Sequence, residues 1–316
     1  MKIVVLDRLA LGSDIPLDAL TELGAVTIYD ASTSEEAVER SRDADIIILN
    51  KIKITEETMI SAKHLKLICV TATGYDNIDI SAAKRYGIGV TNVPGYSTNS
   101  VTIFTIATVL SLTTKIREYN EHVVSGEYEN RGVPNRLEPV YHEMLRKTWG
   151  IVGYGNIGRS VSRVAEALGA RVLVYKRTPT EEADCVDFES LCRESDIITV
   201  HCPLNPESRE LICEKTISLM KDGVIIVNEA RGAVVNENDI TNAVLSGKIG
   251  AYGSDVYTIE PFGKDHPFAK IMGLPNVLLT PHAAWGAYEA RKRCIDIVVS
   301  NISAFVRGNI QNRVDI

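Results

Sequence analysis

The stretch from Lys147 to Lys176 constrains the possible folds of this chain more than any other part of the sequence. An apolar run ends at Val152, a turn rich in glycine follows, and apolar residues then recur at the spacing of one helix face before a second apolar run, Val172 to Tyr175. Strand, glycine turn, amphipathic helix and strand in this order are typical of a dinucleotide-binding corner. The residues expected to contact the dinucleotide here are Gly153, Tyr154, Gly155, Asn156, Ile157 and Gly158.

The three glycines of this turn have separate expected roles. Gly153 permits the tight turn, Gly155 lets the backbone approach a pyrophosphate, and Gly158 lets the helix pack closely against the strand. The anion would bind free N–H groups at the positive end of the helix dipole. The pattern G-x-G-x-x-G is weak evidence by itself. Its position between two strands is what indicates a dinucleotide site.

The composition indicates a soluble protein with room for two domains. A chain of 316 residues exceeds what one core usually supports. The net charge of -7 and the lack of a basic run argue against nucleic acid or an anionic membrane as a partner. Six cysteines without metal-type spacing predict reduced thiols, a cytoplasmic protein and no metal site. No apolar run suits a signal peptide or a membrane span.

Short apolar runs and helical stretches alternate along the rest of the chain. Because parallel neighbours need a crossover connection, this alternation predicts parallel sheets covered on both faces, with ligands beyond the carboxyl ends of the strands. Residues 99–121 differ, since they are apolar almost all round. We expect them to form one helix that is stabilised by burial between domains or between subunits. Residues 126–146 are polar and predict an exposed excursion.

Three polar side chains near expected strand ends have the chemistry that hydride transfer with a dinucleotide requires. Arg231 can hold a carboxylate through two hydrogen bonds. His282 can act as a general acid near neutral pH, and the opposite charge of Glu260 can hold the other imidazole nitrogen. Each residue alone is more often structural or exposed. Only their joint occurrence after a dinucleotide corner favours a catalytic interpretation.

At these residues the chain resembles the D-isomer-specific 2-hydroxyacid dehydrogenases, within them the glycerate dehydrogenase (hydroxypyruvate reductase) branch, over essentially its whole length. The segments that carry the resemblance are residues 72–79, 92–98, the glycine turn, 228–232 and 280–285. The resemblance implies an α/β fold of two doubly wound parallel-sheet domains with a cleft between them. A flavodoxin-like substrate domain would comprise residues 1–97 and 287–316, and a Rossmann domain for NAD(P) would comprise residues 98–286.

The resemblance also implies a reaction and a set of roles. The reaction is the interconversion of a 2-keto acid and a D-2-hydroxy acid, with hydroxypyruvate and glyoxylate as leading substrates. Arg231 would orient the substrate, His282 would be the acid/base and Glu260 its partner. Substrate contacts are expected at Asn50, Lys51, Thr73, Gly74, Tyr75 and Trp285. Further cofactor contacts are expected at Thr102, Lys176, Arg177, Thr178, Cys202, Pro203, Ala230 and Asp255. A homodimer built on residues 99–121 is also implied.

Two positions depart from the family pattern. Ile103 and Phe104 replace a polar pair, so a polar group near the substrate or the dimer contact is expected to be absent. NAD enzymes place an acidic residue after the second cofactor strand to bond the ribose hydroxyls, whereas this chain has Lys176-Arg177-Thr178. Lysine and arginine can neutralise a 2′-phosphate. We therefore expect use of NADP(H), slightly favoured over NAD(H).

Other functions are compatible with the same fold. A nucleotide-sensing binding protein, like the co-repressors that share this architecture, is one alternative, because fold alone does not fix function. The joint presence of Arg231, Glu260 and His282 favours an enzyme. Within the enzymes, a D-lactate-type dehydrogenase is an alternative, and a formate or phosphite dehydrogenase is a weaker one because those substrates lack a carbon skeleton for Trp285 to cover.

Overall fold

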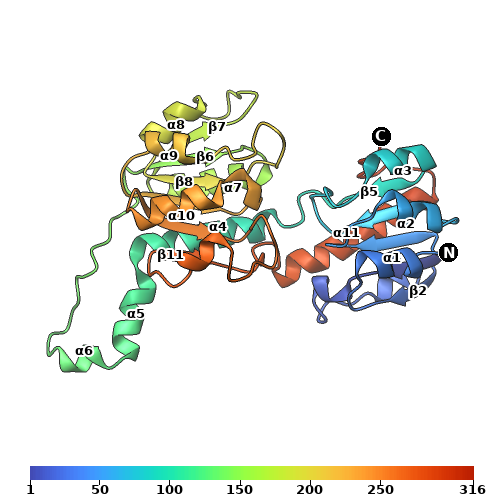
Figure 1. The fold of residues 1–316 in the computed structure, drawn as a ribbon, viewed down its shortest axis with the longest axis horizontal. Coiled ribbons are helices and arrows are strands. Elements are labelled where there is room, and N and C mark those ends of the chain that lie inside the picture. Colours follow the sequence, from blue (N-terminus) through green and yellow to red (C-terminus); the bar gives the residue numbers. More distant parts are fainter. The chain divides into compact units, whose positions relative to one another are not determined.

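The computed structural model describes residues 1–316, and the chain divides into two compact units (Figure 1). Unit 1 comprises Met1–Ser97 and Trp285–Ile316, and unit 2 comprises Thr98–Ala284. The boundary expected after residue 286 thus lies earlier. Trp285 packs edge-on against Tyr96, with ring centroids 6.2 Å apart, and joins the core of unit 1.

Unit 1 contains a five-stranded sheet in the order β2-β1-β3-β4-β5, in which every pairing is parallel. One face is covered by α1, α2 and α3, and the other by α11 (Figure 1). Every residue of β3 and β4 is buried, which explains their continuous apolar sequences. The elements are β1 (Lys2–Val5), β2 (Ala25–Ile28), β3 (Ile46–Leu49), β4 (Leu67–Val70), β5 (Gly89–Thr91), α1 (Ser34–Arg40), α2 (Glu56–Ser61), α3 (Ile80–Tyr86) and α11 (Tyr288–Val306), with short 3-10 helices at Arg8–Leu11 and Asp18–Leu20.

Unit 2 contains a six-stranded parallel sheet in the order β11-β10-β9-β8-β6-β7. One face packs on α4 and α7, and the other on α8, α9 and α10. The strands are β6 (Thr148–Val152), β7 (Arg171–Tyr175), β8 (Ile197–Val200), β9 (Val224–Asn228), β10 (Ile249–Ser254) and β11 (Val277–Leu279). The helices are α4 (Thr98–Thr114), α7 (Asn156–Ala167), α8 (Phe188–Glu194), α9 (Glu214–Leu219) and α10 (Glu237–Leu245), with 3-10 helices at Gly232–Val234 and Pro267–Lys270. The predicted fold class, two doubly wound parallel sheets, is confirmed.

The strand order of unit 2 reverses direction at β6. From β6 the chain first adds β7 on one side and then β8 on the other. Ligands of open parallel sheets bind beyond the carboxyl ends of the strands at such a reversal. The glycine turn follows β6 directly, so the fold places it at the expected position for a ligand.

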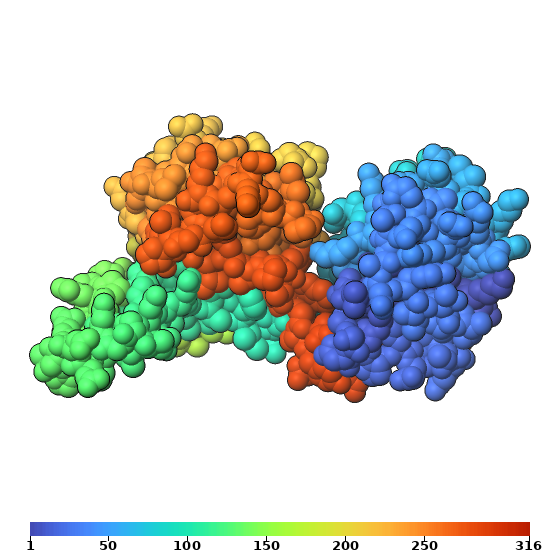
Figure 2. Space-filling view, turned by 60° about the horizontal axis from the view of Figure 1, so that its bottom comes forward, coloured from blue at the N-terminus to red at the C-terminus, as the bar shows by residue number.

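The expected single helix over residues 99–121 is wrong. The chain breaks at Lys115, whose φ of 56° is left-handed, and α4 and α5 (Ile116–Val124) meet at a bend of 64°. α5, α6 (Glu127–Asn130) and the loop after them project from the sheet of unit 2 as an arm, drawn in green (Figures 1 and 2). None of the helices has, by itself, both the length and the apolar composition of a membrane span, and only α4 and α5 taken together across their bend reach them.

Candidate active site

The glycine turn between β6 and α7 has the space and the exposed donors that a phosphate requires. Gly153 has a φ of 95°, and a Cβ there would lie 2.7 Å from the backbone N of Cys202. A Cβ on Gly158 would lie 2.1 Å from the carbonyl oxygen of Gly153, so this glycine is required by packing. A Cβ on Gly155, by contrast, meets nothing within 4 Å, and no side chain caps the start of α7. The first N–H groups of α7 therefore suit an anion such as a pyrophosphate.

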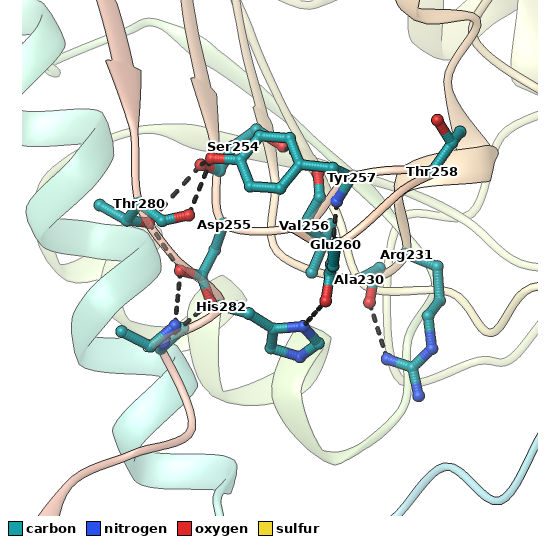
Figure 3. Close-up of polar contacts among 12 residues, drawn as sticks. Ala230, Arg231, Ser254, Asp255, Val256, Tyr257, Thr258, Glu260, Thr280 and His282 are labelled. Carbon is teal, nitrogen blue, oxygen red and sulfur yellow. Dashed lines mark hydrogen bonds and ion pairs between the residues drawn. The ribbon is translucent and has the colours of Figure 1, made fainter. Parts of the chain in front are cut away.

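Arg231 lies in a loop that is held tightly beyond the end of β9. The side chain of Asn228 donates to the Arg231 carbonyl (2.9 Å) and accepts from the Ala230 N–H (3.1 Å). Arg231 Nη1 donates to the carbonyl of Ala230 at 2.8 Å (Figure 3). A Cβ on Gly232 would lie 2.0 Å from the backbone of Tyr257, so this loop is pressed against the loop after β10. Both loops therefore fix the backbone at Arg231, from which its side chain extends.

His282 and Glu260 are in direct contact. Nδ1 of His282 lies 2.6 Å from Oε2 of Glu260, and the other oxygen of Glu260 accepts from the Tyr257 N–H at 3.0 Å (Figure 3). With the carboxylate ionised, Nδ1 carries the hydrogen of this bond, and Nε2 lies on the opposite side of the ring. His282 has a φ of 53°, a left-handed conformation that residues other than glycine seldom adopt and that recurs at functional sites.

Asp255 fixes the turn that carries His282. Its buried carboxylate accepts from the hydroxyl of Thr280 (2.6 Å) and from the N–H groups of Ala283 and Ala284 (both 2.8 Å; Figure 3). The Tyr257 hydroxyl adds a bond to the carbonyl of Thr280 at 2.8 Å. Asp255 was expected to contact the cofactor. The structure adds a second task, which is to position the turn on both sides of His282.

Glu229 is a buried carboxyl group that the sequence interpretation did not single out, although it lies within a segment that carries the family resemblance. Burial, together with the negative charge of Asp255, raises the pKa of Glu229 to about 9. Neither carboxyl oxygen makes a hydrogen bond of normal geometry, and the nearby Thr108 hydroxyl only partly offsets the shift. Glu229 is therefore protonated at neutral pH.

The candidates of unit 1 lie beyond the ends of β3 and β4. The N–H groups of Asn50 and Lys51 donate to the buried carboxylate of Asp7 at 2.9 and 2.8 Å. The Asn50 side chain donates to the carbonyl (2.9 Å) and hydroxyl (3.0 Å) of Thr71. Burial raises the pKa of Asp7, although its N–H donors act in the opposite direction. The role of Asp7 was not predicted, because its hydrogen-bond partners are distant in the sequence. The remaining candidates of this unit are Thr73, Gly74 and Tyr75 in the loop after β4, and Trp285.

The remaining cofactor candidates lie in α4 and in loops after strands of unit 2. Lys176 is half-buried after β7, and Arg177 Nη1 forms an ion pair with Glu207 Oε2 at 3.1 Å. Thr178 is exposed. Thr102 is buried in α4, where its hydroxyl donates to the carbonyl of Thr98 at 2.7 Å. The other expected contacts follow strand ends: Cys202 and Pro203 after β8, and Ala230 after β9. The chain contains no cluster of three or more His, Cys, Asp or Glu side chains able to hold a metal ion.

Comparison with known proteins identifies the family. A profile described as "D-isomer specific 2-hydroxyacid dehydrogenase, NAD binding domain" matches residues 106–284. The chain belongs to the D-isomer-specific 2-hydroxyacid dehydrogenases. It is 38% identical to a hydroxypyruvate reductase of Blautia hydrogenotrophica over 324 residues, covering 100% of both chains. It is 37% identical to a glycerate dehydrogenase of Methylorubrum extorquens, covering 90% of this chain and 89% of that one.

Solved structures agree with this assignment. The D-lactate dehydrogenase of Aquifex aeolicus, complexed with NAD and lactic acid, superposes with a TM-score of 0.87 at 31% identity and covers 100% of this chain and 99% of its own. An acyclic imino acid reductase in complex with NADPH and D-Arg has a TM-score of 0.88 at 29% identity, covering 99% and 100%. The predicted family and its glycerate dehydrogenase and hydroxypyruvate reductase branch are confirmed. The protein is an oxidoreductase of small keto and hydroxy acids with a nicotinamide cofactor.

The raised pKa of Glu229 predicts a specific pH dependence of stability. In the unfolded chain this carboxyl ionises near its ordinary value of 4.5, and in the folded chain near 9. Between these values folding takes up a proton, so the free energy of unfolding falls as pH rises, by up to about 1.4 kcal/mol per pH unit. Glu229→Gln cannot ionise and loses this contribution to the slope.

Denaturant titrations from about pH 5 to about pH 8.5 measure the effect. As the pH rises, the free energy of unfolding of Glu229→Gln is expected to increase relative to that of the parent. Glu181→Gln, at an exposed position, is the control and should follow the parent. Parallel curves for Glu229→Gln and the parent would mean that Glu229 is ionised in the folded protein.

Proposed function

We propose that this protein is an NAD(P)-dependent D-2-hydroxyacid dehydrogenase that reduces hydroxypyruvate or glyoxylate, with His282, Glu260 and Arg231 as its catalytic residues. The observation that carries the proposal is the 2.6 Å contact between His282 Nδ1 and Glu260 Oε2, which orients the imidazole ring of a candidate proton donor. The full-length similarity to a hydroxypyruvate reductase supports the substrate class.

Each catalytic residue has one task in this proposal. The nicotinamide, when bound, supplies the hydride that reduces the keto carbon. His282 donates the Nε2 proton to the carbonyl oxygen as negative charge develops there, and Glu260 holds the ring in place through Nδ1. Arg231 binds the substrate carboxylate through paired hydrogen bonds and so orients the carbonyl. A keto acid, NAD(P)H and one proton thus give a D-2-hydroxy acid and NAD(P)+.

The two units divide the binding tasks. Unit 2 binds the cofactor, with the pyrophosphate on the turn of Gly153 and Gly155. Asp255 meets the nicotinamide amide, and Lys176 and Arg177 accept a 2′-phosphate where an acid would otherwise bond the ribose. NADP(H) is slightly favoured in this proposal. Unit 1 binds the substrate. Its contacts are Asn50, Lys51, the amides of residues 73–75, and Trp285.

A homodimer through α4 and the arm completes the proposal. Apolar side chains of α4, α5 and the loop after α6 are exposed in the single chain, including Ile103 (60%), Val124 (76%), Leu137 (74%) and Val140 (67%). Soluble proteins seldom expose so many large apolar side chains along one segment unless a partner covers them. A second copy of this chain is the partner proposed here, because α4 belongs to the segment expected to join subunits.

A substrate panel tests the reaction. We expect kcat/KM to be highest for hydroxypyruvate or glyoxylate, with pyruvate and phenylpyruvate lower, and NADPH to serve at least as well as NADH. A preference for pyruvate of about tenfold would replace the proposal with a D-lactate-type dehydrogenase, which the similarity to the Aquifex enzyme supports. A hundredfold advantage of NADH would contradict the cofactor preference. Nucleotide binding without turnover on any keto acid would favour a sensor.

Substitution of His282 tests the catalytic assignment. His282→Asn fits the left-handed backbone and removes the proton donor, so kcat should fall by about 10²–10⁴-fold. The dissociation constant for NADPH, measured by fluorescence, should stay within about threefold. His64→Asn changes an exposed histidine of unit 1 and serves as the control. If His282→Asn keeps more than about a tenth of the parental kcat, another group is the acid.

Sedimentation tests the dimer. Two chains of 34.7 kDa give 2 × 34.7 = 69.4 kDa. The double variant Val124→Asp and Leu137→Asp places charge on the arm and is expected to sediment as a monomer with unchanged far-UV circular dichroism. Ile310→Asp changes an exposed apolar residue of unit 1 and should remain a dimer. A parent that sediments as a monomer removes this part of the proposal.

A further inference from the structure

We infer that Glu207 is a specificity-determining residue that weakens the binding of NADP(H) relative to NAD(H), because its carboxylate occupies Arg177 and adds negative charge where a 2′-phosphate would bind. This inference rests on the proposed use of a nicotinamide cofactor at the glycine turn. It concerns a residue outside the segments that carry the family resemblance. The sequence interpretation treated Lys176 and Arg177 as unopposed cations, and the structure places an anion against one of them.

The topology brings Glu207 to the correct edge of the sheet. β7 and β8 lie on the two sides of β6, so the loops after them border the glycine turn from opposite sides. The loop after β8 touches that turn, since a Cβ on Gly153 would lie 2.7 Å from the backbone N of Cys202. Arg177 in one loop and Glu207 in the other join across this space, with Nη1 and Oε2 3.1 Å apart.

Glu207 is held in place by its own loop. The side-chain oxygen of Asn205 accepts from the N–H groups of Glu207 and Ser208, both at 2.9 Å. The Ser208 hydroxyl donates to the carbonyl of Pro203 at 2.7 Å. These bonds fix the backbone from which the carboxylate projects toward Arg177. Hydrogen bonds within the loop after β8 therefore position the backbone of Glu207.

Glu182 does not perform the same task as Glu207. Glu182, in the loop after β7, pairs with Arg159 of α7. Lys176 forms no ion pair, so Lys176, Arg177 and Glu207 together leave one net positive charge at the end of β7. A 2′-phosphate must share Arg177 with Glu207, whereas a ribose hydroxyl is neutral and meets no such repulsion.

The ion pair has little structural value of its own. The two side chains are 77% and 68% exposed, and pairs of this kind contribute little to folding stability. Glu207 can therefore be neutralised without risk to the fold. A phosphate carries a charge of about −1.5 to −2 near pH 7, so removing one negative charge nearby is expected to change its binding about tenfold, and less at high salt.

Binding of two fragments that differ by one phosphate tests the inference. Calorimetry with adenosine 2′,5′-bisphosphate and with 5′-AMP is carried out on the parent, Glu207→Gln and Glu210→Gln. Glu210 lies in the same segment, is exposed and forms no ion pair, so its variant makes the same change in net charge. We expect Glu207→Gln to bind adenosine 2′,5′-bisphosphate about tenfold more tightly than the parent does, and to bind 5′-AMP with an affinity within about twofold of the parent's. Glu210→Gln should alter neither by more than about twofold.

Kinetics give a second readout. The ratio of kcat/KM for NADPH to that for NADH should rise about tenfold in Glu207→Gln, and adding Arg177→Gln should reverse most of the gain. Equal effects of Glu207→Gln and Glu210→Gln, or no effect of either, overturn the inference. Fragment binding needs no turnover, so the inference survives if the proposed keto acid is wrong. Failure of both fragments to bind the parent would overturn the cofactor site and the inference together.

Discussion

The parallel register of β9, β10 and β11 is the constraint on which the candidate active site depends. Ser254 of β10 pairs with Asn228 of β9 on one side and with Leu279 of β11 on the other, so the three strands end in line. Arg231 and His282 each lie three residues beyond these ends, and Glu260 lies in the loop between β10 and β11. The paired strands thus bring residues that are far apart in the sequence to the same edge of the sheet.

Both units use a buried carboxylate next to a strand end to hold a functional loop. In unit 1, Asp7 accepts from the backbone of Asn50 and Lys51. In unit 2, Asp255 accepts from the backbone of Ala283 and Ala284. A buried carboxylate is costly unless hydrogen bonds surround it, so each loop conformation is coupled to the satisfaction of its acid. The loops that carry the candidate side chains are consequently held by buried carboxylates that the proposal does not use as acid or base.

The sequence predicted what local patterns encode. Glycine spacing, strand alternation and residues at strand ends predicted the turn at Gly153 and the contact of Glu260 with His282. Long-range pairings were not predictable in this way. The contacts of Asp7 with Asn50 and of Arg177 with Glu207 join residues 43 and 30 positions apart, and neither residue carries a local signal of its partner. The helix break at Lys115 was also missed, because neither glycine nor proline marks it and a single left-handed residue redirects the chain.

The left-handed backbone of His282 has a consequence for protein engineering. The direction of the imidazole is set by the main chain of His282, with φ at 53°. It is also set by the next two N–H groups, those of Ala283 and Ala284, which both donate to the carboxylate of Asp255. Copying the histidine and glutamate alone onto another scaffold would therefore not reproduce their geometry. A transplant would also need a turn that tolerates a left-handed residue, together with an acid on the neighbouring strand to bind the amides that follow it.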